Sequence, residues 1–315
     1  MNTAVKLGIY FAGLVVVFGG ALGVGALAGP QETTQTAHAS EGATAAHGTD
    51  DHSATAQEQS GQESGHGSDG HGTDGRAGEQ VGVPGGLQVS EGGVALVPES
   101  PTLTPGEETR FRFTVTGADG RPVTAYKTEH EKKLHFIVVS RDLGHFQHLH
   151  PELGGDGVWS VPLELPSAGT YRAFADFTPD PGDNLTLGVD LFAAGDYTPE
   201  PAPAVNRVAT VDGYTVTLAG DLVPGTASTL TVQVAKDGKP VTDLQPYLGA
   251  YGHLVALRSG DLAYLHVHPE TSTTAGPAIT FRTEVPSLGD YRLFLDFQHG
   301  GKVRTADFTV QAHQH

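Results

Sequence analysis

Cysteine is absent from this chain, and Met1 is its only methionine. Without cysteine the protein can form no disulfide, carry no lipid on a cysteine and offer no thiolate to a metal ion. Because no thioether lies beyond Met1, a soft Cu(I) site is excluded as well. Any metal ion bound by this chain is therefore expected to be a divalent ion held by imidazole or carboxylate groups.

Basic residues are also scarce, since 18 Lys and Arg stand against 36 Asp and Glu and give a net charge of -18. Nucleic acid is a polyanion that proteins bind through basic patches, so this charge argues against a nucleic-acid partner. Helical periodicity is missing outside one N-terminal segment. The rest of the chain consists of short β-type runs separated by Gly and Pro, a pattern typical of all-β proteins.

The N-terminal segment is hydrophobic. Leu7 to Ala28 is an uncharged run of 22 residues that follows Lys6, and a helix of that length can span a bilayer. We therefore expect residues 1–28 to form a single-pass anchor in the cell membrane, with the bulk of the chain outside the cytoplasm. A cleavable signal peptide is the alternative, because Ala26-Leu27-Ala28 has the small-x-small form of a cleavage site.

Residues 29–86 contain mainly small, polar and acidic residues and almost no large apolar ones. Such a segment cannot bury enough surface to fold, so we expect a disordered tether. The tether carries five histidines, three of them in a His-Gly-Thr/Ser-Asp pattern: His38, His47, His52, His66 and His71. They either bind divalent metal weakly or are solvated residues of a biased linker, and the sequence leaves both interpretations open.

Two copies of one pattern follow, at residues 87–198 and 207–315, joined by a Pro-rich linker at 199–206. Each copy contains seven or eight short β-type runs, which predicts an immunoglobulin-like β-sandwich. A Gly-x-Tyr sequence opens a late strand in each copy, at Tyr171 and Tyr291, and resembles the tyrosine corner of such sandwiches. The predicted fold class is therefore all-β, with two tandem immunoglobulin-like sandwiches.

The most informative repeated stretch is a predicted β-hairpin, LHFIVVSRDLGHFQHLHPE at 134–152 and GHLVALRSGDLAYLHVHPE at 252–270. We expect a two-residue loop at Asp142-Leu143 in the first copy and a type II′ turn at Gly260-Asp261 in the second. An offset of 118 maps three histidines of the first hairpin onto three of the second: His135, His148 and His150 onto His253, His266 and His268.

In the predicted register, His135 lies opposite His150, and His253 lies opposite His268. Alternate residues on a strand share a face, so His148 and His266 join these pairs. Imidazoles on strand positions roughly 5 to 7 Å apart can converge on one ion. Each copy is therefore predicted to hold one divalent metal ion, copper or zinc.

Further candidates surround each cluster. Asp176 and Asp296 stand at matched places in apolar strands, where each is either a fourth ligand or the acceptor that fixes a histidine tautomer. His130 is an additional candidate in the first copy, because its counterpart is Leu248. His145 is expected on the opposite strand face from His148, which makes it a doubtful ligand.

The motifs Leu-His-Phe-Ile-Val-Val-Ser-Arg-Asp-Leu and Phe-Gln-His-Leu-His-Pro-Glu, both in the first hairpin, resemble membrane-anchored secreted proteins of actinobacteria. These are distantly similar to exported sandwich domains of the FixH or YtkA type, which are linked to heavy-metal handling, chiefly of copper. The resemblance implies a metal-handling context and carries over His135, His148 and His150 by motif. The second copy departs from it, because Gly-Asp replaces Arg-Asp-Leu in the turn.

We thus expect a non-enzymatic, extracytoplasmic metal-binding protein that buffers metal or passes it to an exported metal-handling protein or a metal transporter. One alternative is a scaffold or adhesion protein with structural histidines, since Ile137 and Val139 share their strand face. A metal hydrolase is another, because three histidines with an open position resemble a catalytic zinc site. Its general base would be Glu152 or Glu270, each beyond a proline in an expected turn.

Overall fold

The computed structural model describes residues 83–314, apart from 266, 271 and 273. All regular secondary structure in this range is β-strand, which confirms the all-β prediction. Within the same range, no helix is long and apolar enough to cross a membrane. The expected anchor at 1–28 and all but the last four residues of the expected tether lie outside the described residues.

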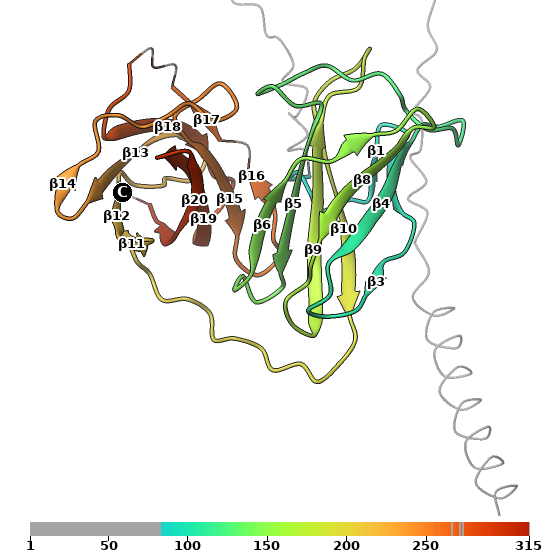
Figure 1. The fold of residues 1–315 in the computed structure, drawn as a ribbon, viewed down its shortest axis with the longest axis horizontal. Coiled ribbons are helices and arrows are strands. Elements are labelled where there is room, and N and C mark those ends of the chain that lie inside the picture. The colour runs from blue at the N-terminus through green and yellow to red at the C-terminus, as the bar shows by residue number, and fades with distance from the viewer. Residues whose placement is uncertain (1–82, 266, 271, 273, 315) are drawn as a thin grey trace, which may run out of the picture. The chain divides into compact units, whose positions relative to one another are not determined.

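The first sandwich packs two five-stranded sheets, with strand orders β1-β2-β4-β8-β7 and β3-β10-β9-β5-β6 (Figure 1). Its core lies between the sheets and is rich in aromatic rings, among them Phe113, Phe136 and Trp159. The strand bounds are β1 Ser90–Glu91, β2 Val94–Pro98, β3 Thr102–Leu103, β4 Thr109–Thr116, β5 Leu134–Ser140, β6 Phe146–Leu149, β7 Glu152–Leu153, β8 Val158–Leu163, β9 Gly169–Phe177 and β10 Leu185–Ala193.

The second sandwich repeats this plan. One sheet has the order β11-β12-β13-β18-β17, with β14 paired to β13, and the other has the order β16-β15-β19-β20. Its core includes Phe281, Phe297 and Phe308. The strand bounds are β11 Val208–Val211, β12 Tyr214–Ala219, β13 Ala227–Lys236, β14 Lys239–Pro240, β15 His253–Arg258, β16 Tyr264–Leu265, β17 His268–Pro269, β18 Ala278–Glu284, β19 Gly289–His299 and β20 Lys302–Ala312.

Both sandwiches contain the expected tyrosine corner. The phenol of Tyr171 donates a hydrogen bond to the carbonyl of Ser167 at 2.9 Å, and that of Tyr291 donates to the carbonyl of Ser287 at 2.8 Å. Both rings are buried, so each phenol fixes the turn before β9 or β19 from inside the core. The two copies of the sequence pattern therefore share the same hydrogen bond as well as the same strands.

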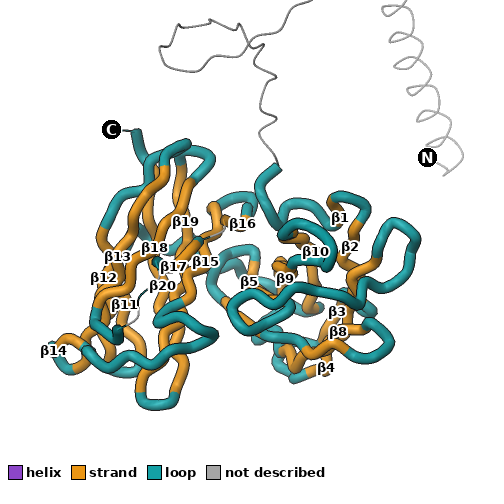
Figure 2. Tube along the Cα trace, turned by 90° about the horizontal axis from the view of Figure 1, so that it is seen from above, coloured by secondary structure: helices purple, strands orange, loops and turns teal. Residues whose placement is uncertain are grey.

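The two sandwiches pack directly on one another through side chains of β5 and β15, and these two strands lie close together in Figure 2. Every residue of β5 is buried, because alternate side chains enter the first core while Ile137 and Val139 face the second sandwich. Val255 and Leu257 of β15 meet them there. A strand with two apolar faces must be covered on both sides, and both sandwiches accordingly belong to one compact unit.

Aromatic pairs show that this interface has approximate twofold symmetry. Phe146 of the first copy stacks on Phe294 of the second, with ring centroids 4.0 Å apart. The corresponding residues with exchanged roles, Tyr264 and Phe174, are 5.6 Å apart. Because the same surface of each copy contacts the other, residues of one copy lie beside the histidines of its neighbour.

The hairpin register is as predicted in the first copy, where Ile137 pairs with His148. The loop is longer than the predicted two residues. The last backbone hydrogen bond between the two strands runs from Ser140 N to the His145 carbonyl, which leaves residues 141–144 in the loop. Leu143 within this loop has a positive φ of 65°. The register set by the hydrophobic pattern is therefore retained although the turn differs.

The second hairpin departs further from the prediction. Leu262 N donates to the Arg258 carbonyl, so the turn is not the two-residue type II′ form. Strand β16 ends at Leu265, and His268 belongs to β17, which pairs with β18 in the other sheet. The predicted strand pairing of His253 with His268 is therefore wrong, because the chain crosses between sheets before it reaches His268.

Candidate metal centre

The three histidines predicted from the first copy come together at the interface between the sandwiches. One ligand nitrogen of each of His135, His148 and His150 lies within 4.8 Å of those of the other two. His135 Nδ1 and His148 Nε2 are only 3.1 Å apart. His135 comes from the interface face of β5, while His148 and His150 come from β6 and the residue after it.

Each of these rings has an oxygen atom beside its other nitrogen. The carbonyl of Glu129 accepts a hydrogen bond from His135 Nε2 at 3.2 Å, and the Asp296 carboxylate accepts one from His148 Nδ1 at 2.8 Å. The Tyr247 phenol oxygen lies 3.5 Å from His150 Nδ1. Asp296 and Tyr247 belong to the second copy, so the second sandwich supplies two of the three oxygens that orient the triad.

These oxygens determine the tautomers. A carbonyl accepts only, so His135 carries its hydrogen on Nε2, and the carboxylate likewise places a hydrogen on His148 Nδ1. The lone pairs of His135 Nδ1 and His148 Nε2 then face each other across 3.1 Å. Such a contact requires a proton or a cation between the two nitrogens. Two imidazoles on a tetrahedral zinc ion have nitrogens roughly 3.3 Å apart, given Zn–N bonds of about 2.0 to 2.1 Å.

The third histidine has the nitrogen that completes such a site. His150 Nε2 is fully buried and has no hydrogen-bond partner among the described residues. A buried polar atom without a partner typically costs about 1 to 3 kcal/mol, which a bound ion would offset. Because its Nδ1 faces the Tyr247 phenol, the free Nε2 is the nitrogen available to the cluster.

Burial keeps two of these imidazoles, His135 and His150, neutral. Burial, together with the neighbouring His148, lowers the pKa of His135 to about 3. Burial and the adjacent His148 and His135 also lower the pKa of His150 to about 3. A neutral imidazole is the form that ligates a metal ion, so at neutral pH these two rings need release no proton to bind one.

The predicted aspartates contact the opposite sandwich. In each copy the aspartate pairs across strands with its own histidine, His135 with Asp176 and His253 with Asp296. The carboxylate of Asp296 nevertheless accepts from His148 of the first copy, and from Thr305 at 2.6 Å. The carboxylate of Asp176 accepts from the phenol of Tyr264 in the second copy at 3.4 Å. Asp296 thus accepts a hydrogen bond from a histidine of the other repeat.

The second predicted cluster is described only in part. His266 lies outside the described residues, and the His268 side chain is not described either. His253 Nε2 donates to the Tyr247 carbonyl at 2.7 Å, which matches the bond from His135 to Glu129 at the same offset of 118. The His253 ring also lies near the first triad, with its centroid 6.5 Å from that of His148.

A family model for a domain of unknown function, DUF8832, matches residues 88–191 and again residues 209–314. The chain belongs to the DUF8832 family. The two matched ranges coincide with the two sandwiches, so each sandwich is one DUF8832 repeat. No curated protein matches the chain.

Among solved structures, a DUF4426 family protein from Pseudomonas aeruginosa is 10% identical, covers 35% of this chain and 99% of its own, and has a TM-score of 0.27. A chimeric titin Z1Z2 tandem is 15% identical over 70% of this chain and 96% of its own, with a TM-score of 0.19. Domains 4 and 5 of the S-layer protein SbsC are 12% identical over 71% and 98%, with a TM-score of 0.21. At such scores these likenesses carry no argument about function.

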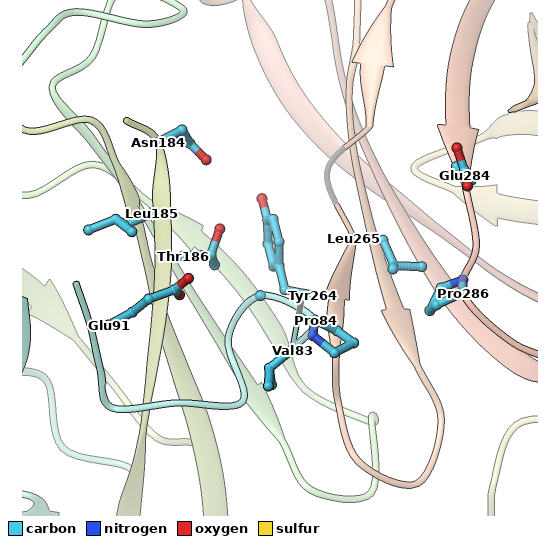
Figure 3. A pocket seen from close by; sticks show the side chains of 11 residues that line it. Val83, Pro84, Glu91, Asn184, Leu185, Thr186, Tyr264, Leu265, Glu284 and Pro286 are labelled. Atoms are coloured by element: carbon cyan, nitrogen blue, oxygen red, sulfur yellow. The ribbon is translucent and has the colours of Figure 1, made fainter. Parts of the chain in front are cut away.

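Several cavities lie between the DUF8832 repeats. A small one of about 40 Å³ is lined by His130, His135, His148 and His253 together with Asp176 and Tyr264. A groove of about 400 Å³ is lined by Val83–Gly85, Thr186 and Tyr264, and no histidine among the described residues lines it (Figure 3). The metal-ligating chemistry is therefore concentrated in the small buried cavity and the adjoining triad.

Sequence reasoning missed Tyr247 and the carbonyl of Glu129. These two residues occupy the same position in the two repeats, six residues before the first histidine of each hairpin. Their side chains differ, so the carbonyl that each uses to hold a histidine left no residue pattern to detect. The role of Tyr247 at His150 was hidden for another reason, because it depends on contact between the repeats.

Proposed function

We propose that the first DUF8832 repeat binds one divalent transition-metal ion through His135, His148 and His150. The observation that carries this proposal is the 3.1 Å contact between His135 Nδ1 and His148 Nε2, two nitrogens whose other ring positions face hydrogen-bond acceptors. A structural histidine cluster would turn hydrogen-bond donors toward acceptors. This one turns lone pairs toward each other and leaves the third nitrogen, on His150, without a partner.

The ligand set favours Cu(II) or Zn(II). Imidazole nitrogens suit both ions, and the chain has neither a cysteine nor a methionine beyond Met1 for a softer site. The acceptors behind the rings act as outer-shell groups that fix ring orientation and strengthen the ligands. We favour copper on the resemblance of the hairpin motif to FixH- and YtkA-type domains.

The biological role that we propose is extracytoplasmic metal buffering or delivery, without catalysis. A partner would be an exported metal-handling protein or a metal transporter, and the segment at 1–28 would hold the chain at the membrane. A hydrolase needs a free general base beside the metal. Of the two candidates, Glu152 is exposed on β7 in the other sheet, and the Glu270 carboxylate pairs with Arg282 Nε at 2.7 Å, so neither is suited to that role.

Equilibrium titration tests the proposal. The full-length chain, without an affinity tag and with the five tether histidines changed to Gln, is titrated with Cu(II) or Zn(II) against a chelator of known affinity. This parent protein is compared with a His148→Ala variant and with His145→Ala, a control in the same hairpin outside the triad. We expect His148→Ala to lose one tightly bound equivalent and His145→Ala to lose none.

Two results would reject the proposal. If the parent binds no stoichiometric metal, the histidines are structural and the scaffold alternative is favoured. If His148→Ala binds as much metal as the parent and with the same affinity, the ion lies elsewhere in the chain. Unfolding of both variants is monitored in parallel, so that a loss of fold is not mistaken for a loss of ligands.

A further inference from the structure

A turn with unusual backbone geometry precedes the first triad. Glu129 and Lys132 exchange two backbone hydrogen bonds, and the two residues between them, His130 and Glu131, have positive φ angles of 47° and 62°. Residues with a Cβ adopt this conformation at a cost of roughly 1 to 2 kcal/mol each. Strained residues are frequent at ligand sites, which directs attention to the side chain that the turn presents.

The second repeat contains the same turn. Tyr247 and Ala250 exchange the same two hydrogen bonds, and Leu248 and Gly249 have φ angles of 53° and 77°. His130 therefore occupies a place that Leu248 fills in the other repeat. The fold accepts a leucine there, so the histidine is not needed to form the turn.

His130 stands between an outer groove and the inner cavity. It lines a groove of about 290 Å³, together with Glu270 and Thr280, and also the cavity of about 40 Å³ beside the triad. Its ring centroid is 5.3 Å from that of His253 and 6.1 Å from that of His135. Among the described residues, His130 has ring contacts but no hydrogen bond, so its ring nitrogens are available.

His253 faces His130 from the second repeat. Its Nε2 donates to the Tyr247 carbonyl, which leaves the lone pair on Nδ1. Imidazoles from two different repeats thus border a cavity of about 40 Å³, whose volume exceeds the roughly 10 to 15 Å³ that one water requires.

We propose that His130 and His253 form a capture site, where an incoming Cu(II) or Zn(II) ion exchanges part of its water before it moves to the triad. This inference rests on the proposed function of the triad. Two imidazoles and water bind an ion less tightly than three imidazoles with outer-shell acceptors, so the ion passes inward. The groove at Glu270 connects the capture site with solvent on the outer side of His130.

Stopped-flow kinetics of Zn(II) and Cu(II) binding test the capture site. The experiment uses the full-length chain with the tether histidines changed to Gln, and its His130→Leu variant, which carries the residue found in the second repeat. A group outside the final site alters the rates of entry and exit equally and leaves the equilibrium unchanged. We expect both rate constants to fall about tenfold in His130→Leu, with Kd within about twofold of the parent value.

Two further variants sharpen the comparison. His145→Ala should bind at the parent rate, because this second extra histidine of the first repeat does not border the cavity. His130→Leu and His253→Gln are also measured singly and together. The double variant should bind metal no more slowly than the slower of the two single variants, because the effects of residues that act as one unit are not additive.

The outcomes separate the two proposals. If the parent binds metal and His130→Leu binds it at an unchanged rate, the capture site is refuted while the triad stands. If His130→Leu instead weakens Kd through faster release, His130 is a ligand of the final site and the capture role is also refuted. If the parent binds no metal, the triad proposal fails and the capture site fails with it.

Discussion

The substitution Asp296→Asn tests how far the second repeat governs the metal site of the first. Asp296 belongs to the second repeat, yet its carboxylate accepts the hydrogen bond from His148 Nδ1 at 2.8 Å. Both side chains of this pair are only 6% exposed. The carboxylate therefore acts on the ligand in a nearly water-free setting, where its effect on ring orientation and basicity is strong.

The expected magnitude follows from the contacts of Asp296. An asparagine can still accept from His148 Nδ1 through its amide oxygen, and its amide nitrogen can donate to Thr305 Oγ1, which now donates to the carboxylate at 2.6 Å. The ring orientation is then kept and only the negative charge is lost. Because outer-shell groups contribute about 10- to 100-fold to metal affinity, we expect about tenfold weaker binding for Asn and about 100-fold for Ala.

Competition with a chromophoric chelator measures this affinity in the chain without tether histidines. Asp243→Asn serves as the matched control. Asp243 is likewise an aspartate of the second repeat that pairs with a histidine, but its partner is His299, at 3.1 Å, and the carboxylate is exposed to solvent. We expect the control to bind like the parent. If Asp296→Asn and Asp296→Ala both leave the metal Kd within about twofold of the parent, Asp296 does not orient a ligand and our assignment of tautomers is wrong.

Three other predictions concern the same interface. Calorimetry of Zn(II) binding at neutral pH, in buffers of different ionisation enthalpy, should show fewer than two protons released per ion, because His135 and His150 are already neutral; release of two or more would contradict this. Because the folded pKa values of His135 and His150 lie near 3 and the unfolded value near 6.5, metal-free protein should be most stable above pH 6.5. It should lose up to about 1.4 kcal/mol per pH unit for each ring as the pH falls toward 3, whereas a flat denaturation profile would oppose this. Finally, Phe294→Ala should lower the free energy of unfolding by about 3 to 5 kcal/mol in chemical denaturation, and a loss under about 1 kcal/mol would mean that the repeats fold independently.

The hydrophobic pattern of the chain determines most of the fold. Alternation and Gly or Pro punctuation predicted short β-strands throughout both copies, and the repeated Gly-x-Tyr predicted the tyrosine corners. These features are local, because they depend on residues within one strand and its turn. Turn geometry could not be predicted in the same way. Leu143 and Leu262 adopt positive φ angles, a conformation that is usually indicated in a sequence by glycine.

The sequence predicted the ligands that one repeat supplies to the candidate site, but not the residues that the other repeat contributes. The spacing of His135, His148 and His150 was sufficient to expect a cluster, because strand alternation and hairpin register are sequence properties. That Asp296 holds His148 depends on how two sandwiches pack, and no periodicity within either copy encodes that contact. A strand such as β5, apolar on both faces, was the one available sign that the histidine face would be covered.

Anomalous X-ray scattering from crystals grown with Zn(II), measured on both sides of the zinc absorption edge, tests the central claim most directly. The account predicts a zinc peak enclosed by His135 Nδ1, His148 Nε2 and His150 Nε2, with His148 Nδ1 still bonded to Asp296. An unoccupied triad, in which His135 and His148 keep their direct 3.1 Å contact in the presence of excess zinc, would contradict it.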